Sequence, residues 1–219
     1  MNPYSHLILA KRVEDLLQPV DLQDYYWGAI VPDIRYLAGM ERRKTHFKKE
    51  KCVQLMAQFP KLESFLQGYL VHCLADRISI QKLFQSTFPF SVVRNRLHRK
   101  QIAVLLELFY VKGNTFTPKI TASYNQVLRN LGLQEEDCIR YSEFINQYVG
   151  SESLEQKISS FAQMLSLTNN PNIDRYISAA NWIENNPLLQ NLLVLGIRAG
   201  RINEKIETSL VALLNESAN

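Results

Sequence analysis

Residues 61–85, KLESFLQGYLVHCLADRISIQKLFQ, carry the longest apolar helical pattern in this 219-residue chain. Apolar side chains recur there at helical spacing, and they cover more than one face of the expected helix. A helix that is apolar on several faces is normally buried in the core of a protein. The stretch therefore predicts a central helix against which the rest of the chain packs.

Helical patterns continue on both sides of this segment. One apolar stripe follows Ser5, which is a candidate N-cap, and consists of Leu7, Leu9, Val13, Leu16 and Leu17. A second stripe, at Cys52, Leu55, Met56 and Phe59, ends before Pro60. Further helices are predicted over 97–112, 118–131, 135–148, 152–166, 172–185 and 187–214. Because no segment alternates as a strand does, the chain is expected to be all-α, with residues 1–219 forming a single multi-helix domain.

Composition and cysteine usage favour a cytoplasmic protein. The chain is 46% hydrophobic and 21% charged, as in ordinary globular proteins, and no apolar run approaches the ~18 residues of a membrane span. The N-terminus has no basic segment before its short apolar patch, so it does not resemble a signal peptide. Cys52, Cys73 and Cys138 lie in apolar contexts without CxxC spacing, which predicts buried free thiols and no disulfide.

The net charge of +4 is concentrated in a basic run at residues 42–51. Such a run is either a solvated loop leading into a helix or an electropositive rim that attracts phosphates or an anionic surface. It has no interleaved aromatic residues and matches no nucleic-acid-binding motif. Charge is thus the sole argument for nucleic-acid binding, and no specific nucleic-acid partner is expected.

A histidine and an aspartate lie within GYLVHCLADRI, an otherwise apolar part of the central segment. His72 and Asp76 are four residues apart, so their side chains project from the same face of a helix. This spacing lets one helix offer an imidazole and a carboxylate to a divalent metal ion. A plain His–Asp hydrogen bond is the alternative. A buried carboxylate needs a cation or hydrogen-bond donors in either case.

Three more candidate ligands lie earlier in the chain. Asp33 follows Pro32 in YYWGAIVPDIRYLAG, residues 25–39, where an isolated Asp is first interpreted as a turn residue or a helix N-cap. His6 and His46 each follow a hydroxyl residue. With His72 and Asp76 they make five imidazole and carboxylate groups from four segments, a set suited to zinc. Spacing alone does not show that the segments converge.

The order of these motifs resembles the zinc-dependent phospholipase C family. SHLILAKRVEDLL, DYYWGAIVPDI, KTHF and FLQGYLVHCLAD occur in the family's order, over about residues 4–86. The match is most similar to the catalytic domain of glycosylphosphatidylinositol-specific phospholipase D and to small bacterial relatives. Beyond residue 90 only a compatible helical pattern remains.

The resemblance implies specific roles for these residues. Asp33, His46, His72 and Asp76 would hold one zinc ion, and His6 would help to hold a second ion that Asp76 bridges. The carboxylate that matches Asp33 is also assigned in the family as the general base toward the attacking water. The expected fold is the all-α phospholipase C type.

The chain also departs from the family pattern. Three-zinc members have a further histidine shortly after the HxxxD motif and then an HxxxE pair. Here Ile80, Gln81 and Lys82 occupy the first region, and no HxxxE occurs. His98, in RNRLHRK, does not match the pattern and is interpreted as a surface histidine. The retained ligands account for one zinc ion, or two with His6.

Two functional hypotheses follow from these observations. The first is a zinc-dependent phosphoester hydrolase acting on a phospholipid headgroup or related phosphodiester, with Asp33 as base and Arg35 or the basic run at 42–51 binding the phosphate. With fewer metals than the family, its activity is expected to be weak or specialised. The alternative is a non-catalytic helical protein with a reduced or structural metal site. An open coordination position and a cleft distinguish the first from the second.

Overall fold

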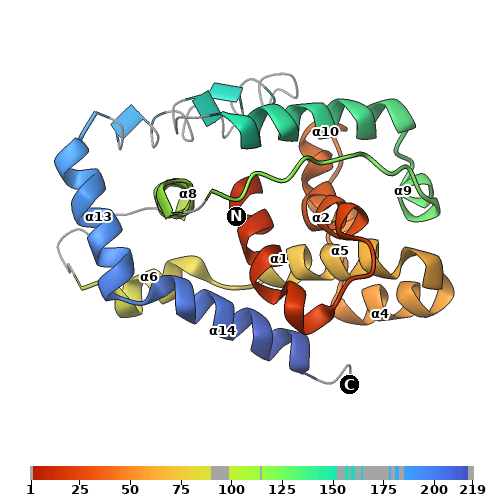
Figure 1. Cartoon of the computed structure of the whole chain (residues 1–219), viewed down its shortest axis with the longest axis horizontal. Coiled ribbons are helices and arrows are strands. Elements are labelled where there is room, and N and C mark those ends of the chain that lie inside the picture. Colours follow the sequence, from red (N-terminus) through yellow and green to blue (C-terminus); the bar gives the residue numbers. More distant parts are fainter. Residues whose placement is uncertain are drawn as a thin grey trace.

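The central apolar segment forms helix α5, Glu63–Ala75, which is buried over nearly its whole length. The structure is a computed structural model of the chain. The structure describes residues 2–89, 99–113, 115–151, 156–157, 159–160, 164, 178, 181–182 and 185–216. As predicted, α5 is central. It contacts helices α1 (Pro3–Leu17), α2 (Leu22–Ile30), α4 (Lys49–Gln58) and α14 (Ile202–Asn215), as Figure 1 shows.

Helices α2 and α5 touch through their backbones. A Cβ atom added at Gly28 would clash with the carbonyl group of Phe65, and one added at Gly68 would clash with that of Tyr25. Only glycine permits this separation, because any larger residue would push the helices apart. The two glycines therefore set the distance between α2, which leads into Asp33, and α5, which carries His72.

The other elements surround this pair. Helix α1 lies against α2, α5, α8 and α14, and α10 crosses one side of the molecule while α14 runs along the opposite side (Figure 1). None of the described residues lies in a strand, so the all-α prediction is confirmed, and the helices form a compact domain. The remaining elements are η1 (Val31–Tyr36), α3 (Arg42–Thr45), η2 (Pro60–Leu62), α6 (Ile80–Thr87), α8 (Arg99–Gly113), α9 (Gln126–Asn130), α10 (Glu135–Gly150) and α13 (Pro187–Ala199).

The prediction of one continuous helix over 61–85 is wrong, because α5 ends at Ala75 and α6 begins at Ile80. Asp76 is the C-cap of α5 and keeps a helical backbone conformation. After it, the backbone amides of Arg77 and Ile78 donate to the carbonyl oxygens three residues earlier, those of Leu74 and Ala75, at 3.0 and 3.2 Å. These tighter 3-10 hydrogen bonds end the helix. The break leaves Asp76 at an end of the central helix while it still lies one turn from His72.

The prediction of a helix over 118–131 is also wrong for the first half of that range, since α9 spans only Gln126–Asn130. The side-chain amide of Asn146, on α10, accepts from the backbone amide of Ile120 and donates to its carbonyl, each at 2.7 Å. These bonds satisfy backbone groups that would otherwise bond within a helix. Asn125 then caps α9 by accepting from the amides of Val127 and Leu128 at 3.0 and 3.2 Å.

Two other boundaries differ from expectation. The helix predicted over 187–214 is divided into α13 and α14 at Arg201, whose left-handed backbone, with φ of 48°, ends one helix and turns the chain into the next. Helix α1 begins at Pro3, so Ser5 lies inside its first turn and is not the N-cap. The helices predicted over 152–166 and 172–185 fall largely outside the described residues, and His98 lies entirely outside them.

The cysteine prediction is confirmed, since Cys52, Cys73 and Cys138 are all free and buried. In the part of the chain that the structure describes, every helix is too short or too polar to cross a bilayer.

Candidate metal centre

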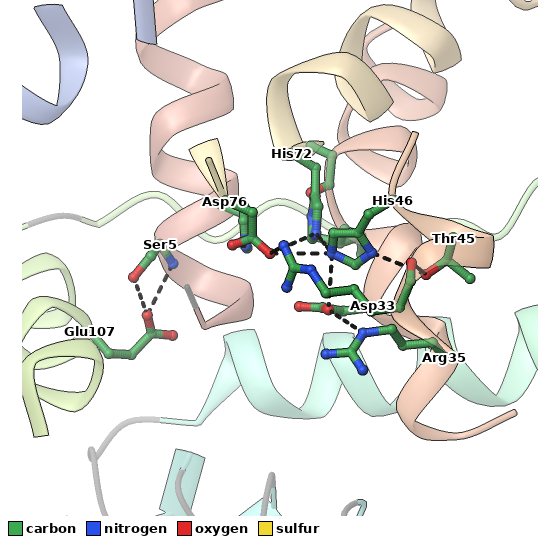
Figure 2. A network of polar contacts seen from close by, with 12 residues as sticks. Ser5, Asp33, Arg35, Thr45, His46, His72, Asp76 and Glu107 are labelled. Atoms are coloured by element: carbon green, nitrogen blue, oxygen red, sulfur yellow. Dashed lines mark hydrogen bonds and ion pairs between the residues drawn. The ribbon is translucent and has the colours of Figure 1, made fainter. Parts of the chain in front are cut away.

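The structure brings all five predicted ligands to one place beside the α2–α5 contact. Asp33, His46, His72 and Asp76 are labelled in Figure 2. The ligand atoms of His6, Asp33 and His72 lie within 4.8 Å of one another, and so do those of His46, His72 and Asp76. His72 belongs to both groups. The residues come from α1, η1, the end of α3 and the end of α5, so the cluster joins four separate segments.

His72 is fixed in one orientation and one tautomer. Its Nδ1 lies 2.8 Å from the carbonyl oxygen of Ala29, in the last turn of α2, where a helix leaves carbonyl groups available. A carbonyl accepts only, so Nδ1 carries the hydrogen and Nε2 of the neutral ring presents a lone pair to the cluster. This second hydrogen bond is the usual support of a metal-binding histidine.

The surroundings also keep His72 neutral. Burial lowers the pKa of His72 well below 6.5, and His6 and His46 lower it further, while Asp76 and the Ala29 carbonyl act in the opposite direction. A metal binds the neutral imidazole. His72 is therefore already in its ligand form at neutral pH.

His46 occupies the middle of the cluster. Its Nε2 lies 3.2 Å from Asp76 Oδ2, 3.2 Å from His72 Nε2 and 3.8 Å from Asp33 Oδ1. With zinc–ligand bonds of 2.0–2.2 Å, neighbouring ligands of a tetrahedral ion lie about 3.3 Å apart. Two of the three separations agree with that value. His46 Nδ1, on the other side of the ring, lies 3.1 Å from Thr45 Oγ1.

His6 has no hydrogen-bond partner at either ring nitrogen, although its side chain is fully buried. Its ring stacks on His72 with centroids 3.8 Å apart, and its Nε2 lies 3.4 Å from Asp76 Oδ1. Buried polar groups in native proteins are almost always satisfied by protein, water or an ion. An ion at the cluster would satisfy this one.

The two carboxylates of the cluster have different neighbours. Burial acts to raise the pKa of Asp76, but nearby positive charge and the contacts of Asp76 with His46 and His6 outweigh it, and the net pKa is far below the ordinary value of 3.8. Asp76 is therefore ionised. Asp33 Oδ1 lies 3.5 Å from Arg35 Nε (Figure 2). The guanidinium of Arg35 stacks on Tyr36 at 3.8 Å.

These donors fit a transition-metal ion. Magnesium and calcium favour oxygen ligands, whereas three imidazoles with two carboxylates are the ligand types of zinc and its neighbours. The fixed tautomer of His72, the unpartnered His6 and the short separations around His46 each agree with such an ion. The buried histidine and aspartate groups could thus hold a metal ion.

A cavity of about 270 Å³ adjoins the cluster at Asp76. Residues 75–81 and Ala103 line it. Ile80 and Gln81, in the region where three-zinc family members have a further histidine, are among these residues. Where family members have a further histidine ligand, this chain thus has residues that line a cavity beside Asp76.

Sequence reasoning missed Glu107, a fully buried carboxylate on α8. It accepts from the backbone amide of Ser5 at 3.0 Å and from the Ser5 hydroxyl group (Figure 2). It also accepts from the backbone amide of Tyr4 at 3.0 Å and from the hydroxyl group of Tyr148. Burial raises the pKa of Glu107, and these hydrogen bonds oppose that rise. A carboxylate at a helix N-terminus satisfies amides that have no partner within the helix. Glu107 thereby holds the turn that carries His6, and its one signal in the sequence was a charge inside the apolar run IAVLLELFY.

The basic run at 42–51 is not a uniform rim of free charges. Arg42 contacts Asp76 at 2.7 Å, and Lys49 is buried, donating to the carbonyl oxygens of Leu213 and Leu214 at 2.9 and 2.8 Å. Arg43, by contrast, is 82% exposed and pairs with Glu41. At least two of the charges therefore have structural contacts within the molecule.

Comparisons with protein-family models, with curated proteins and with solved structures found no match to this chain.

Proposed function

We propose that this protein is a zinc-dependent phosphoester hydrolase of the phospholipase C type, with its metal centre at the five-residue cluster. One observation carries the proposal: imidazoles and carboxylates from four segments meet in one buried cluster, where His72 presents a fixed lone pair and the ring nitrogens of His6 lack a hydrogen-bond partner. The resemblance of residues 4–86 to the family supplies the reaction class. The substrate would be a phosphodiester, with a phospholipid headgroup as the leading candidate.

In this proposal His46, His72, Asp76 and Asp33 would hold one zinc ion, and His6 with Asp76 would contribute to a second. When bound, the metal supplies Lewis-acid stabilisation of the phosphoryl oxygens and lowers the pKa of a bound water. Asp33 accepts the proton of the attacking water at its carboxylate. Arg35, whose guanidinium lies beside Asp33, orients a phosphoryl oxygen. Hydrolysis is expected to be slow, because the chain lacks the third set of family ligands.

A structural metal site is the second candidate, and burial favours it. The side chains of His6 and His72 are fully buried, and those of Asp33, His46 and Asp76 are 4–8% exposed. Closed sites of this kind commonly stabilise a fold without catalysis. The cavity beside Asp76 supports the catalytic alternative, because it offers room for a substrate group next to the ligands.

The test combines metal analysis with turnover. Zinc content and affinity would be measured on the purified protein, and hydrolysis of bis(p-nitrophenyl) phosphate and of phospholipid vesicles would be followed with and without EDTA. Asp33→Asn is expected to lower turnover by at least about 100-fold, as loss of a general base does. Asp15→Asn, an equal change at an exposed position of α1, is the control and should leave turnover unchanged.

The outcomes separate the two candidates. Turnover that neither EDTA nor Asp33→Asn reduces would contradict the hydrolase mechanism. Stoichiometric zinc without hydrolysis of either substrate would favour the structural site. Absence of zinc binding at micromolar concentrations would contradict both the hydrolase and the structural zinc site.

A further inference from the structure

Arg42 reaches from α3 into the metal centre. Its Nη2 lies 2.7 Å from Asp76 Oδ2, although the Arg42 side chain as a whole is 45% exposed and that of Asp76 only 4%. The guanidinium is thus placed on a buried carboxylate, although nearly half of the Arg42 side chain is in contact with solvent. An arginine in this position can leave without disturbing the core.

The oxygen that Arg42 contacts is one that a metal ion would need. Asp76 Oδ2 also lies 3.2 Å from His46 Nε2 and 4.0 Å from His72 Nε2, which are the other members of one ligand group. Two cations close to the same carboxylate oxygen repel each other. Arg42 and a metal ion in this group therefore compete for Asp76.

We propose that Arg42 is an exchangeable cation: it neutralises Asp76 in the metal-free protein, yields that carboxylate to zinc, and then binds a phosphoryl oxygen of the ligand at the metal. The inference rests on the proposed metal centre and adds a residue that selects for an anionic ligand. It concerns the phosphoryl group, which inorganic phosphate and a phosphoester share.

The anion-binding step follows from the chemistry of the displaced group. A guanidinium presents a planar fork of N–H donors that matches two phosphoryl oxygens, and it keeps its charge at every accessible pH. Once released, Arg42 stays tethered beside the cluster. Arg35 lies beside the other carboxylate, Asp33, and its Nε is buried without a hydrogen-bond partner. A phosphoryl group at the metal would thus meet one guanidinium near each carboxylate.

The test measures two affinities on the full-length protein, with Arg42→Gln as the variant. Zinc affinity is determined by competition with a chromogenic chelator in phosphate-free buffer, and inorganic phosphate binding to the zinc-loaded protein by calorimetry. Arg43→Gln is the matched control, because it removes the same charge from the neighbouring residue, which pairs with Glu41 outside the cluster. Thermal melts confirm that both variants fold.

The two affinities should change in opposite directions. Arg42→Gln is expected to bind zinc about threefold to tenfold more tightly, since a partly exposed arginine–carboxylate pair no longer competes. Its zinc-loaded form should bind phosphate about tenfold more weakly, because one charge-assisted contact is lost. Arg43→Gln should change neither affinity by more than about twofold, as expected of an exposed charge.

Several results would overturn the inference. Unchanged or weaker zinc binding by Arg42→Gln would show that Arg42 does not compete, and unchanged phosphate binding would remove its role with the ligand. A wild-type protein that binds no zinc would refute this inference together with the metal centre. If zinc binds but no phosphoester is hydrolysed, the proposed hydrolase fails while the two affinities still decide the role of Arg42.

Discussion

Gly28 of α2 and Gly68 of α5 each lie so close to the backbone of the other helix that neither position has room for a Cβ atom. The next residue after Gly28 is Ala29, whose carbonyl accepts from His72 Nδ1, and His72 lies one turn beyond Gly68. The close approach of the helices therefore sets the hydrogen bond that orients His72. The packing of the two glycines thus also orients His72, a candidate metal ligand.

The first prediction tests this contact. Gly68→Ala should lower the free energy of unfolding by about 2–3 kcal/mol, because overpacking forces α2 and α5 apart where backbone meets backbone. Urea denaturation would measure the change. Gly150→Ala is the control, since a Cβ atom at Gly150 meets no atom within 4 Å. Equal stability of the two variants would contradict the proposed role of the glycine contact.

The second prediction concerns Glu107. Glu107→Ala should destabilise the protein by about 2–4 kcal/mol, because it leaves a cavity and removes the acceptor for the buried amides of Tyr4 and Ser5. Glu143→Ala, at an exposed position of α10, should change stability by less than about 0.5 kcal/mol. Both free energies come from chemical denaturation. An amide-exchange experiment should show protection lost first in the first turn of α1, and protection retained there would argue against the cap.

The third prediction is a pH dependence of the metal-free protein. The pKa of His72 in the folded state is well below 6.5, whereas the unfolded chain takes up a proton near 6.5. The unfolded state thus binds more protons below about pH 6.5, so the contribution of His72 to stability is present above that pH and is lost as the pH falls. For this one group, the free energy of unfolding changes by at most about 1.4 kcal/mol per pH unit.

The variant His72→Asn isolates this contribution. An asparagine amide can still donate to the Ala29 carbonyl but does not titrate, so the variant should lose stability less steeply between pH 6.5 and 5. Unfolding by urea with EDTA present, repeated at several pH values, gives both slopes. Parallel slopes for wild type and variant would mean that His72 is not the group responsible.

Local patterns predicted much of the chain and failed at particular residues. Periodicity identified α4, α5, α8 and α10, because a helix depends on contacts between residues three and four apart. It did not detect the end of α5 after Ala75, since polar Asp76 and Arg77 still fit a helical pattern. It also extended α9 too far, because the side chain of Asn146 that holds Ile120 comes from another helix.

The sequence by itself determined the helical character of the chain, the burial of its three thiols and the identity of the donors that could hold a metal. Those properties belong to residue types and to short spacings. Only the tertiary structure decided that His6, Asp33, His46, His72 and Asp76 meet, that Ala29 sets the tautomer of His72, and that Arg42 lies on Asp76. The physical reason is that these contacts join segments up to 70 residues apart in numbering, from His6 to Asp76, and depend on how closely whole helices pack.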